Sequence, residues 1–149
     1  MKLTTQLAVI SVLVENQDEA LTFYTEKLGL EKRSDITFGP GMRLLTVASR
    51  GQQKPVIALA RPDATLHGVE HIKELMARPD QPWIFDTDDC WKAYAALCER
   101  GVHFVSTPTQ HLYGLEAVFE DPDGNTFILL EAAPEVRLQL KQYSLGTAA

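Results

Sequence analysis

Short apolar runs separated by polar turns divide the first part of the chain into strand-length segments. Residues 7–14 (LAVISVLV) form a β-branched apolar run, whose length and composition are typical of a buried strand. Residues 42–48 and 55–60 are similar, and the polar stretch between them contains Gly51, which predicts a hairpin. These runs predict a set of strands that ends near residue 62.

A helix is predicted between the first two of these strands. Asn16 and Glu19 have the spacing of a capping pair at a helix start. Apolar residues then recur at intervals of four from Ala20 to Leu28, which predicts one apolar helix face. Gly29 follows directly, where a residue with positive φ commonly ends a helix.

The second half of the chain repeats this order. A helix is predicted from Asp88 or Asp89 to Arg100, and the predicted strands are residues 83–85, 102–105, 115–120 and 126–131. Gly29 and Gly101 are 72 positions apart, and so are Pro62 and Pro134. A constant offset indicates an internal repeat, so the chain is predicted to contain two βαβββ modules.

The domain prediction follows from this repeat and from the length. A chain of 149 residues is typical of one domain. Within that single domain, residues 1–149, we expect a first βαβββ module, a helical linker, a second βαβββ module and a C-terminal tail: residues 5–62, 63–80, 81–133 and 134–149.

Composition and charge narrow the class of protein. The sequence is 45% hydrophobic and 23% charged, values typical of a globular protein. The net charge is −6 and the longest basic cluster is Lys32-Arg33, which argues against a nucleic-acid partner. The apolar run at 7–14 is too short for a membrane span or a signal peptide. Cys90 and Cys98 lie eight apart on a predicted helix, too far for a disulfide, which favours a reducing, cytoplasmic location.

Two longer motifs carry a family resemblance. Residues 14–30 fit the pattern V-x-[DN]-x-x-x-A-x-x-F-Y-x-x-x-L-G-L, and residues 119–131 fit F-x-D-P-D-G-N-x-x-x-L-x-[EQ]. Together they resemble the vicinal oxygen chelate superfamily, which includes glyoxalase I, extradiol dioxygenases, fosfomycin resistance enzymes and bleomycin resistance proteins. The resemblance implies an α+β fold in which two βαβββ modules form a curved mixed sheet with a cleft. It also implies a homodimer.

The resemblance further implies where a metal would bind. Metal-using members carry His, Gln or Glu at four strand positions that face the cleft. The corresponding residues here are Val9, Ala58, Pro82 and Ile128. Because aliphatic side chains offer a metal no N, O or S ligand, we expect no metal, no cofactor and no family catalytic residue. These residues instead predict a hydrophobic floor for a ligand.

Neighbouring residues complete the predicted lining of the cleft. Ser11 and Trp83 lie close to the family positions, although sequence alone leaves open which face of its strand Trp83 occupies. Arg43 either meets an anionic group of a ligand or forms a surface ion pair.

Histidines and one tyrosine are the other candidates. His103 is either an edge or core residue or a ligand contact. His111 and Tyr113 fall in a predicted loop, residues 107–114, that either borders the cleft or is simply exposed. His67 and His71 have a spacing that fits zinc, and a solvated helix face is their other interpretation.

The sequence therefore predicts a metal-free protein that binds a small, partly apolar molecule, with cationic molecules included because of the net charge. The first alternative is a metal-dependent lyase, thiol transferase or dioxygenase with shifted ligands such as Gln81 and His103. A second is metal-free acid–base catalysis by His103, His111 or Asp86. A third is a structural or partner-binding dimer.

Overall fold

The computed structural model describes residues 5–40, 42–61 and 82–140. The chain divides into two compact units, Met1–Pro79 and Asp80–Ala149. Each unit holds a four-stranded mixed sheet and a helix that follows the unit's first strand. The two βαβββ modules expected from the repeat are confirmed as two four-stranded mixed sheets, which together match the α+β fold implied by the resemblance.

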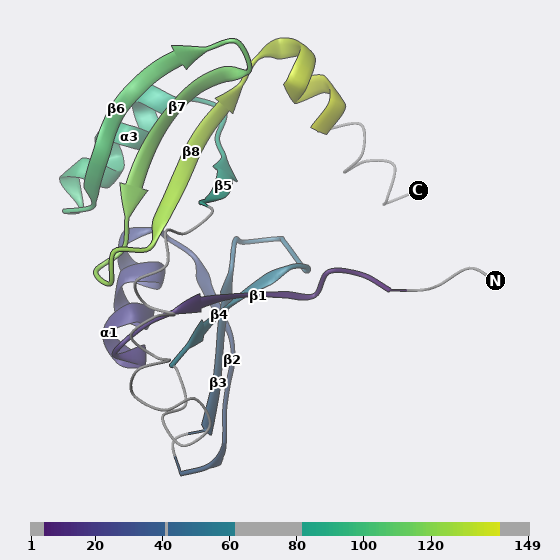
Figure 1. The fold of residues 1–149 in the computed structure, drawn as a ribbon, viewed down its shortest axis with the longest axis vertical. Helices are drawn as coiled ribbons and strands as arrows, with labels where there is room; N and C mark the ends of the chain where they lie inside the picture. The colour runs from purple at the N-terminus through teal and green to yellow at the C-terminus, as the bar shows by residue number, and fades with distance from the viewer. Residues whose placement is uncertain (1–4, 41, 62–81, 141–149) are drawn as a thin grey trace, which may run out of the picture. The chain divides into compact units, whose positions relative to one another are not determined.

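The first unit has its strands in the order β1-β4-β3-β2 (Figure 1). Its elements in chain order are β1 (Val9–Leu13), α1 (Gln17–Thr22), the π-helical turn η1 (Phe23–Lys27), β2 (Glu31–Gly39), β3 (Met42–Ala48) and β4 (Val56–Ala60). β1 and β4 pair in parallel, whereas β4, β3 and β2 form an antiparallel meander. The edge strands of this sheet are therefore β1 and β2.

The second unit repeats this topology with the order β5-β8-β7-β6. Its elements are β5 (Trp83–Asp86), α3 (Cys90–Glu99), β6 (His103–His111), β7 (Gly114–Glu120) and β8 (Thr126–Ala132). β5 pairs in parallel with β8, and the other neighbours are antiparallel. In Figure 1, α3 lies behind the strands of its own sheet.

Alternation along the strands separates two sides of each sheet. In the first unit Val12, Val47 and Leu59 are buried, as expected for the side that packs under α1. In the second unit Phe119 and Phe127 are buried and stack with ring centroids 5.5 Å apart. We call this the helix-facing side of each sheet, and the other side the opposite face.

Helix ends form as the sequence predicts. The side chain of Asn16 accepts a hydrogen bond from the backbone N–H of Glu19 at 3.0 Å, and Asp89 does the same for Lys92 at 3.0 Å. Gly29 and Gly101 close the two helical segments with φ of 77° and 85°. Each cap satisfies an N–H group that the first turn leaves without a helical partner.

Two edge strands extend beyond the sequence prediction. No strand was predicted between Gly29 and Met42, yet β2 occupies most of that stretch. The predicted loop at 107–114 is also wrong, because β6 continues to His111 and only a tight turn separates it from β7. Both strands pair on one side only, which lets them carry polar residues and, in β6, Pro108.

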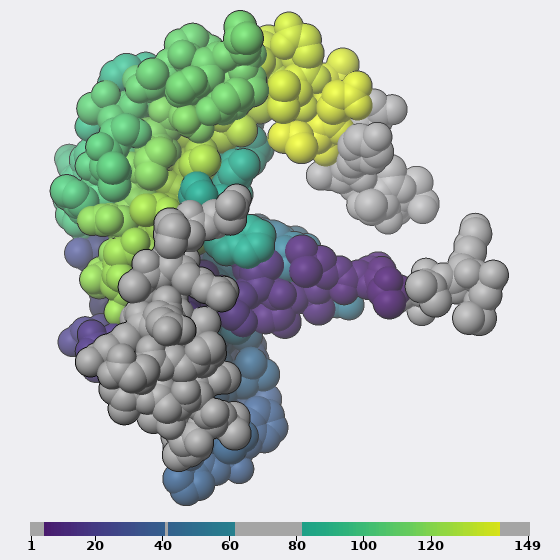
Figure 2. Space-filling view, viewed as in Figure 1, coloured from purple at the N-terminus to yellow at the C-terminus, as the bar shows by residue number. Residues whose placement is uncertain are grey.

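The chain after β8 forms a further helix at residues 134–140. It is yellow in Figure 2, where it adjoins the end of the second sheet. Arg137 donates to the carboxylate of Asp88 at 2.6 Å and to the backbone oxygen of Thr87 at 2.8 Å. These contacts anchor the helix beside the start of α3. The predicted helical linker, with His67 and His71, lies outside the described residues, and so does Gln81 at the start of the predicted second module.

No helix in the described part of the chain is both long and apolar enough to span a membrane.

Candidate ligand-binding site

The opposite face of the first sheet combines a polar row with an apolar end. Across the four strands the ladder places Ser11 beside Ala58, Ala58 beside Thr46, and Thr46 beside Ser34. The hydroxyl oxygens of Ser34 and Thr46 lie 2.6 Å apart in a hydrogen bond. Toward the β2–β3 turn the face becomes apolar and exposed, through Ile36, Phe38, Met42 and Leu44.

A pocket of about 250 Å³ lies at this apolar end. Its lining comes from α1 and from three strands and their ends: Gln17, Phe38, Met42, Arg43, Leu44, Ala60 and Arg61. Phe38 is 66% exposed and Met42 is 56% exposed, so two large apolar side chains face solvent at the pocket. A hollow lined mainly by apolar groups with a few polar ones has the usual composition of a small-molecule site.

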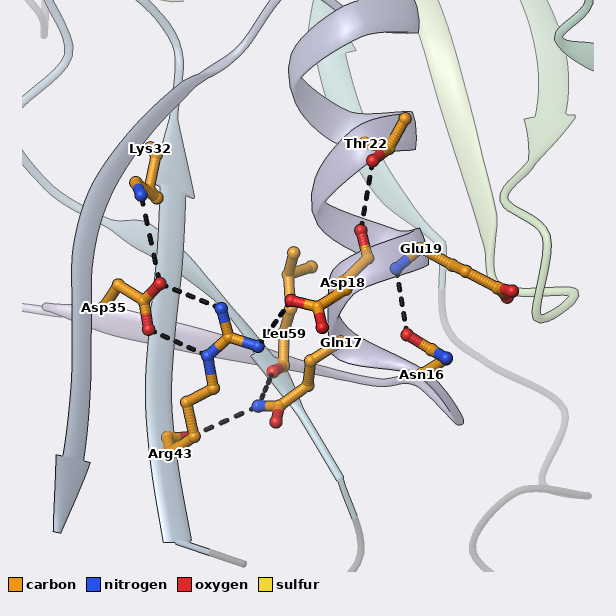
Figure 3. Close-up of polar contacts among 9 residues, drawn as sticks. All are labelled: Asn16, Gln17, Asp18, Glu19, Thr22, Lys32, Asp35, Arg43 and Leu59. Atoms are coloured by element: carbon orange, nitrogen blue, oxygen red, sulfur yellow. Dashed lines mark hydrogen bonds and ion pairs between the residues drawn. The ribbon is translucent and has the colours of Figure 1, made fainter.

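Arg43 is held by two carboxylates beside this pocket (Figure 3). Its Nε and Nη2 atoms donate to the two oxygens of Asp35 at 2.8 Å each, and Nη1 donates to Asp18 at 2.8 Å. Hydrogen bonding to Arg43 lowers the pKa of the Asp35 carboxyl. The bonds from Asp35 and Asp18 in turn raise the pKa of the guanidinium. Of the two interpretations left open by the sequence, the ion pair is the one that the structure contains.

The strand position of Arg43 shows on which side of the sheet its side chain lies. Its neighbour Leu45 shares a strand face with it and is buried, and Asp18 belongs to α1, so the Arg43 side chain lies on the helix-facing side. It reaches the pocket at the end of the sheet and does not lie on the opposite face. Gln17 stabilises the same corner, because its amide N–H donates to the backbone oxygen of Leu59 at 2.8 Å.

The strand register shows what lies beside the residues at the expected family metal positions. Val9 lies beside Val56, and Ile128 lies beside Ile84. Ala58 lies beside Ser11, and Pro82 precedes β5. The side chains of Val9, Ala58, Pro82 and Ile128 offer no N, O or S ligand, so these residues do not fit a metal ion.

Among the described residues, no group of three or more His, Cys, Asp or Glu side chains is close enough together to hold a metal ion.

The second sheet carries ionisable groups on its opposite face. Asp86 and Glu116 both lie beside Leu130, one on each side of β8. Trp83 lies beside Phe127, whose ring is buried under the helix-facing side. Strand alternation therefore places Trp83 on the helix-facing side, which the sequence alone had left open.

His111, Tyr113 and Glu116 form a polar cluster at the β6–β7 turn. The rings of His111 and Tyr113 stack with an interplanar angle of 2° and centroids 5.1 Å apart. His111 Nε2 lies 3.1 Å from a carboxylate oxygen of Glu116, whose side chain is 16% exposed. A hydrogen bond to Glu116 raises the pKa of Tyr113. An imidazole held by a carboxylate is the arrangement of an oriented general base.

His103 is separate from this cluster. It begins β6 with a side chain 72% exposed, and its Nε2 atom lies 3.7 Å from Glu120. The structure thus gives it the edge position that was one of its two interpretations.

Comparison with known proteins identifies the family. The sequence profile of the Glyoxalase/Bleomycin resistance protein/Dioxygenase superfamily matches residues 6–129. The chain belongs to this superfamily, as the two motifs indicated.

Particular relatives share most of the chain. YetH, an uncharacterized protein of Bacillus subtilis, is 32% identical over 85% of this chain and 98% of its own length. UcmS2, known from a crystal structure, is 31% identical in sequence and superposes with a TM-score of 0.75. The match covers 87% of this chain and 100% of UcmS2. TnmS3, an antibiotic binding protein from Streptomyces sp. CB03234, is 27% identical with a TM-score of 0.71. That match covers 89% of this chain and 100% of TnmS3.

Proposed function

We propose that this protein binds a small, largely apolar organic molecule at the pocket of the first unit and holds it without a metal. The observation that carries the proposal is the gathering of exposed Phe38, Met42 and Leu44 around a hollow. Apolar side chains exposed together at a hollow are typical of ligand or partner sites. The similarity to TnmS3, an antibiotic binding protein, supports the same class of function.

The size of the pocket limits what it encloses. A volume of about 250 Å³ is below the roughly 300–1,000 Å³ of pockets for drug-sized ligands. The pocket therefore fits a small molecule, or one ring system of a larger molecule whose remainder lies along the opposite face.

A thermal-shift screen of antibiotics and aromatic compounds tests the proposal. A compound present at 100 times its Kd stabilises the folded protein by about 2.7 kcal/mol. We expect Phe38→Ala to raise the Kd of a hit about tenfold, as for a central aromatic contact. Trp91→Ala is the matched control, because Trp91 is also an exposed aromatic residue (56%) but belongs to the second unit. A screen without hits, or equal losses in both variants, would contradict the proposal.

The alternative of a metal enzyme with shifted ligands has its own test. Elemental analysis of the purified protein, before and after dialysis against a chelator, measures bound metal. We expect well below one metal ion per chain. One equivalent, removed by the chelator together with a turnover activity, would favour the metal-dependent lyase, thiol transferase or dioxygenase.

Proton transfer on a molecule bound at the polar cluster of the second unit is a second candidate function, favoured by the 3.1 Å contact between His111 and Glu116. Mass spectrometry of any hit after long incubation tests it. Conversion of the compound that is lost in His111→Gln would support it, whereas recovery of unchanged compound leaves binding as the function.

A homodimer is part of the proposal, since the family resemblance implies one. Light scattering on a sizing column is expected to give twice the chain mass of 16.6 kDa.

A further inference from the structure

The charged groups that line the pocket are all cationic. Its two charged lining residues are Arg43 and Arg61, and no carboxylate is among the described residues that line it. We propose that the pocket selects organic anions over organic cations of the same shape. This inference rests on the proposed binding function and names the class of ligand.

The two arginines have different roles. The Arg43 guanidinium is already bonded to Asp35 and Asp18, and Lys32 lies 3.9 Å from Asp35, so two cations and two carboxylates balance at this corner. Arg61 directly follows β4 and is exposed, and in the described ranges of the chain no carboxylate forms an ion pair with it. A ligand carboxylate, sulfonate or phenolate can therefore form an ion pair with the Arg61 guanidinium.

An amine at the same place meets the opposite situation. It finds no carboxylate among the described lining residues, and it faces the charge of Arg61. Like charges held near each other weaken binding, and no acid in this part of the lining offsets that cost.

The negative charge of the whole chain does not reverse this preference. A net charge of −6 attracts cations over long distances. At physiological ionic strength, exposed charges more than roughly 8 Å apart are largely screened. A ligand inside the pocket therefore responds mainly to the groups that line it. The pocket is therefore expected to favour anions, although the net charge of the chain favours cations over long distances.

The resulting ligand is a flat apolar body with an acidic group at one end. Phe38, Met42 and Leu44 supply the apolar contacts, and Arg61 meets the acid. In this arrangement the affinity comes from burial of the ring, and the selectivity comes from the charge of the acidic group.

Three probes with the same ring test the inference: 1-naphthoate, 1-naphthylmethylamine and the neutral 1-naphthylmethanol. Their Kd values are measured by calorimetry or ligand-detected NMR on the full chain at 0.15 M salt. We expect naphthoate to bind about two- to fivefold more tightly than the amine, the range of an exposed ion pair. Arg61→Gln is expected to bring this ratio close to one, and Arg61→Glu to reverse it.

Arg50→Gln is the matched control. Arg50 is an exposed arginine of the same unit, paired with Glu31 and absent from the pocket lining. It is expected to leave the ratio unchanged. If the amine or the alcohol binds as tightly as naphthoate, or if Arg61→Gln leaves the ratio intact, anion selectivity is wrong while the binding function stands. If none of the three probes binds, the proposed function itself is contradicted at this pocket.

Discussion

In each unit a hydrogen bond joins the first residue of the helix to the last strand at the same position of the repeat. The two units differ in which partner contributes its side chain and which its backbone. In the first unit, the side chain of Gln17, the first residue of α1, donates to the backbone oxygen of Leu59 at 2.8 Å. In the second unit, the backbone N–H of Cys90, the first residue of α3, donates to the side chain of Glu131 at 2.9 Å. Leu59 and Glu131 are 72 positions apart, the offset of the repeat. The repeat therefore keeps the contact while exchanging which partner supplies the side chain.

The opposite faces differ more than these junctions do. In the first sheet, Ser11 and Thr46 lie on either side of Ala58. In the corresponding row of the second sheet, Asp86 and Glu116 lie on either side of Leu130. Ala58 and Leu130 are again 72 positions apart. Hydroxyl groups in one unit thus correspond to carboxylates in the other. The helix-facing sides hold the fold that the modules share, and the opposite faces hold the chemistry that separates them.

The largest expected effect is on the free energy of unfolding, when the same substitution, Phe to Ala, is made on the helix-facing side and at the pocket. Phe119 is 1% exposed on the helix-facing side, and Phe38 is 66% exposed at the pocket. Phe119→Ala is expected to lower the free energy of unfolding by about 3–5 kcal/mol, since it removes a buried ring and leaves a cavity. Phe38→Ala is expected to stay within about 0.5 kcal/mol of the wild type. Urea denaturation measures both values.

The same two variants also test ligand binding. Phe38→Ala is expected to weaken ligand binding while it leaves stability unchanged. A loss of stability comparable to that of Phe119→Ala would show that Phe38 is a core residue, and would remove it from the site.

A smaller effect tests the two junctions. Glu131→Leu places in the second unit the residue that the first unit has at this position, and it leaves the buried Cys90 N–H without its acceptor. We expect the free energy of unfolding to fall by about 1–2 kcal/mol, the cost of an unsatisfied buried donor. Glu131→Gln keeps a carbonyl acceptor and is expected to cost less than half as much. Equal stability of Glu131→Leu and the wild type would show that the contact does not matter energetically.

Much of the fold was accessible from the sequence because its signals are local. Caps such as Asn16 and Asp89 act over three or four residues, and each inner strand contains a short apolar run. The edge strand β2 and the part of β6 that follows Val105 escaped prediction for a physical reason. A strand paired on one side only tolerates polar residues, so neither shows the apolar run that marks an inner strand.

The site was less predictable than the fold. Gln17, Phe38 and Leu44 are brought together only by the pairing of strands with one another and with α1, and no sequence motif links them. For Arg43, the sequence shows a cation but not the two acids that neutralise it, of which Asp18 is 25 residues away. Phe38 and Met42, on either side of the β2–β3 turn, are exposed apolar residues that could have indicated the site, but only once the hairpin between them was known.

The smallest effect concerns the charge pair at this corner of the first unit. Arg43 lowers the pKa of Asp35, so the ionised carboxyl is favoured in the folded state. The stability that this contributes is present above the unfolded-state value of about 3.9 and is lost as the pH falls through the lower folded-state pKa. Asp35→Asn is therefore expected to be less stable than the wild type at pH 7, with a difference that shrinks below about pH 4. Thermal denaturation from pH 7 to pH 3 measures it, with the exposed Glu26→Gln as control. A difference that stays constant over this range would show that Arg43 does not favour the ionised Asp35, and that the corner beside the pocket is held by Gln17 and packing alone.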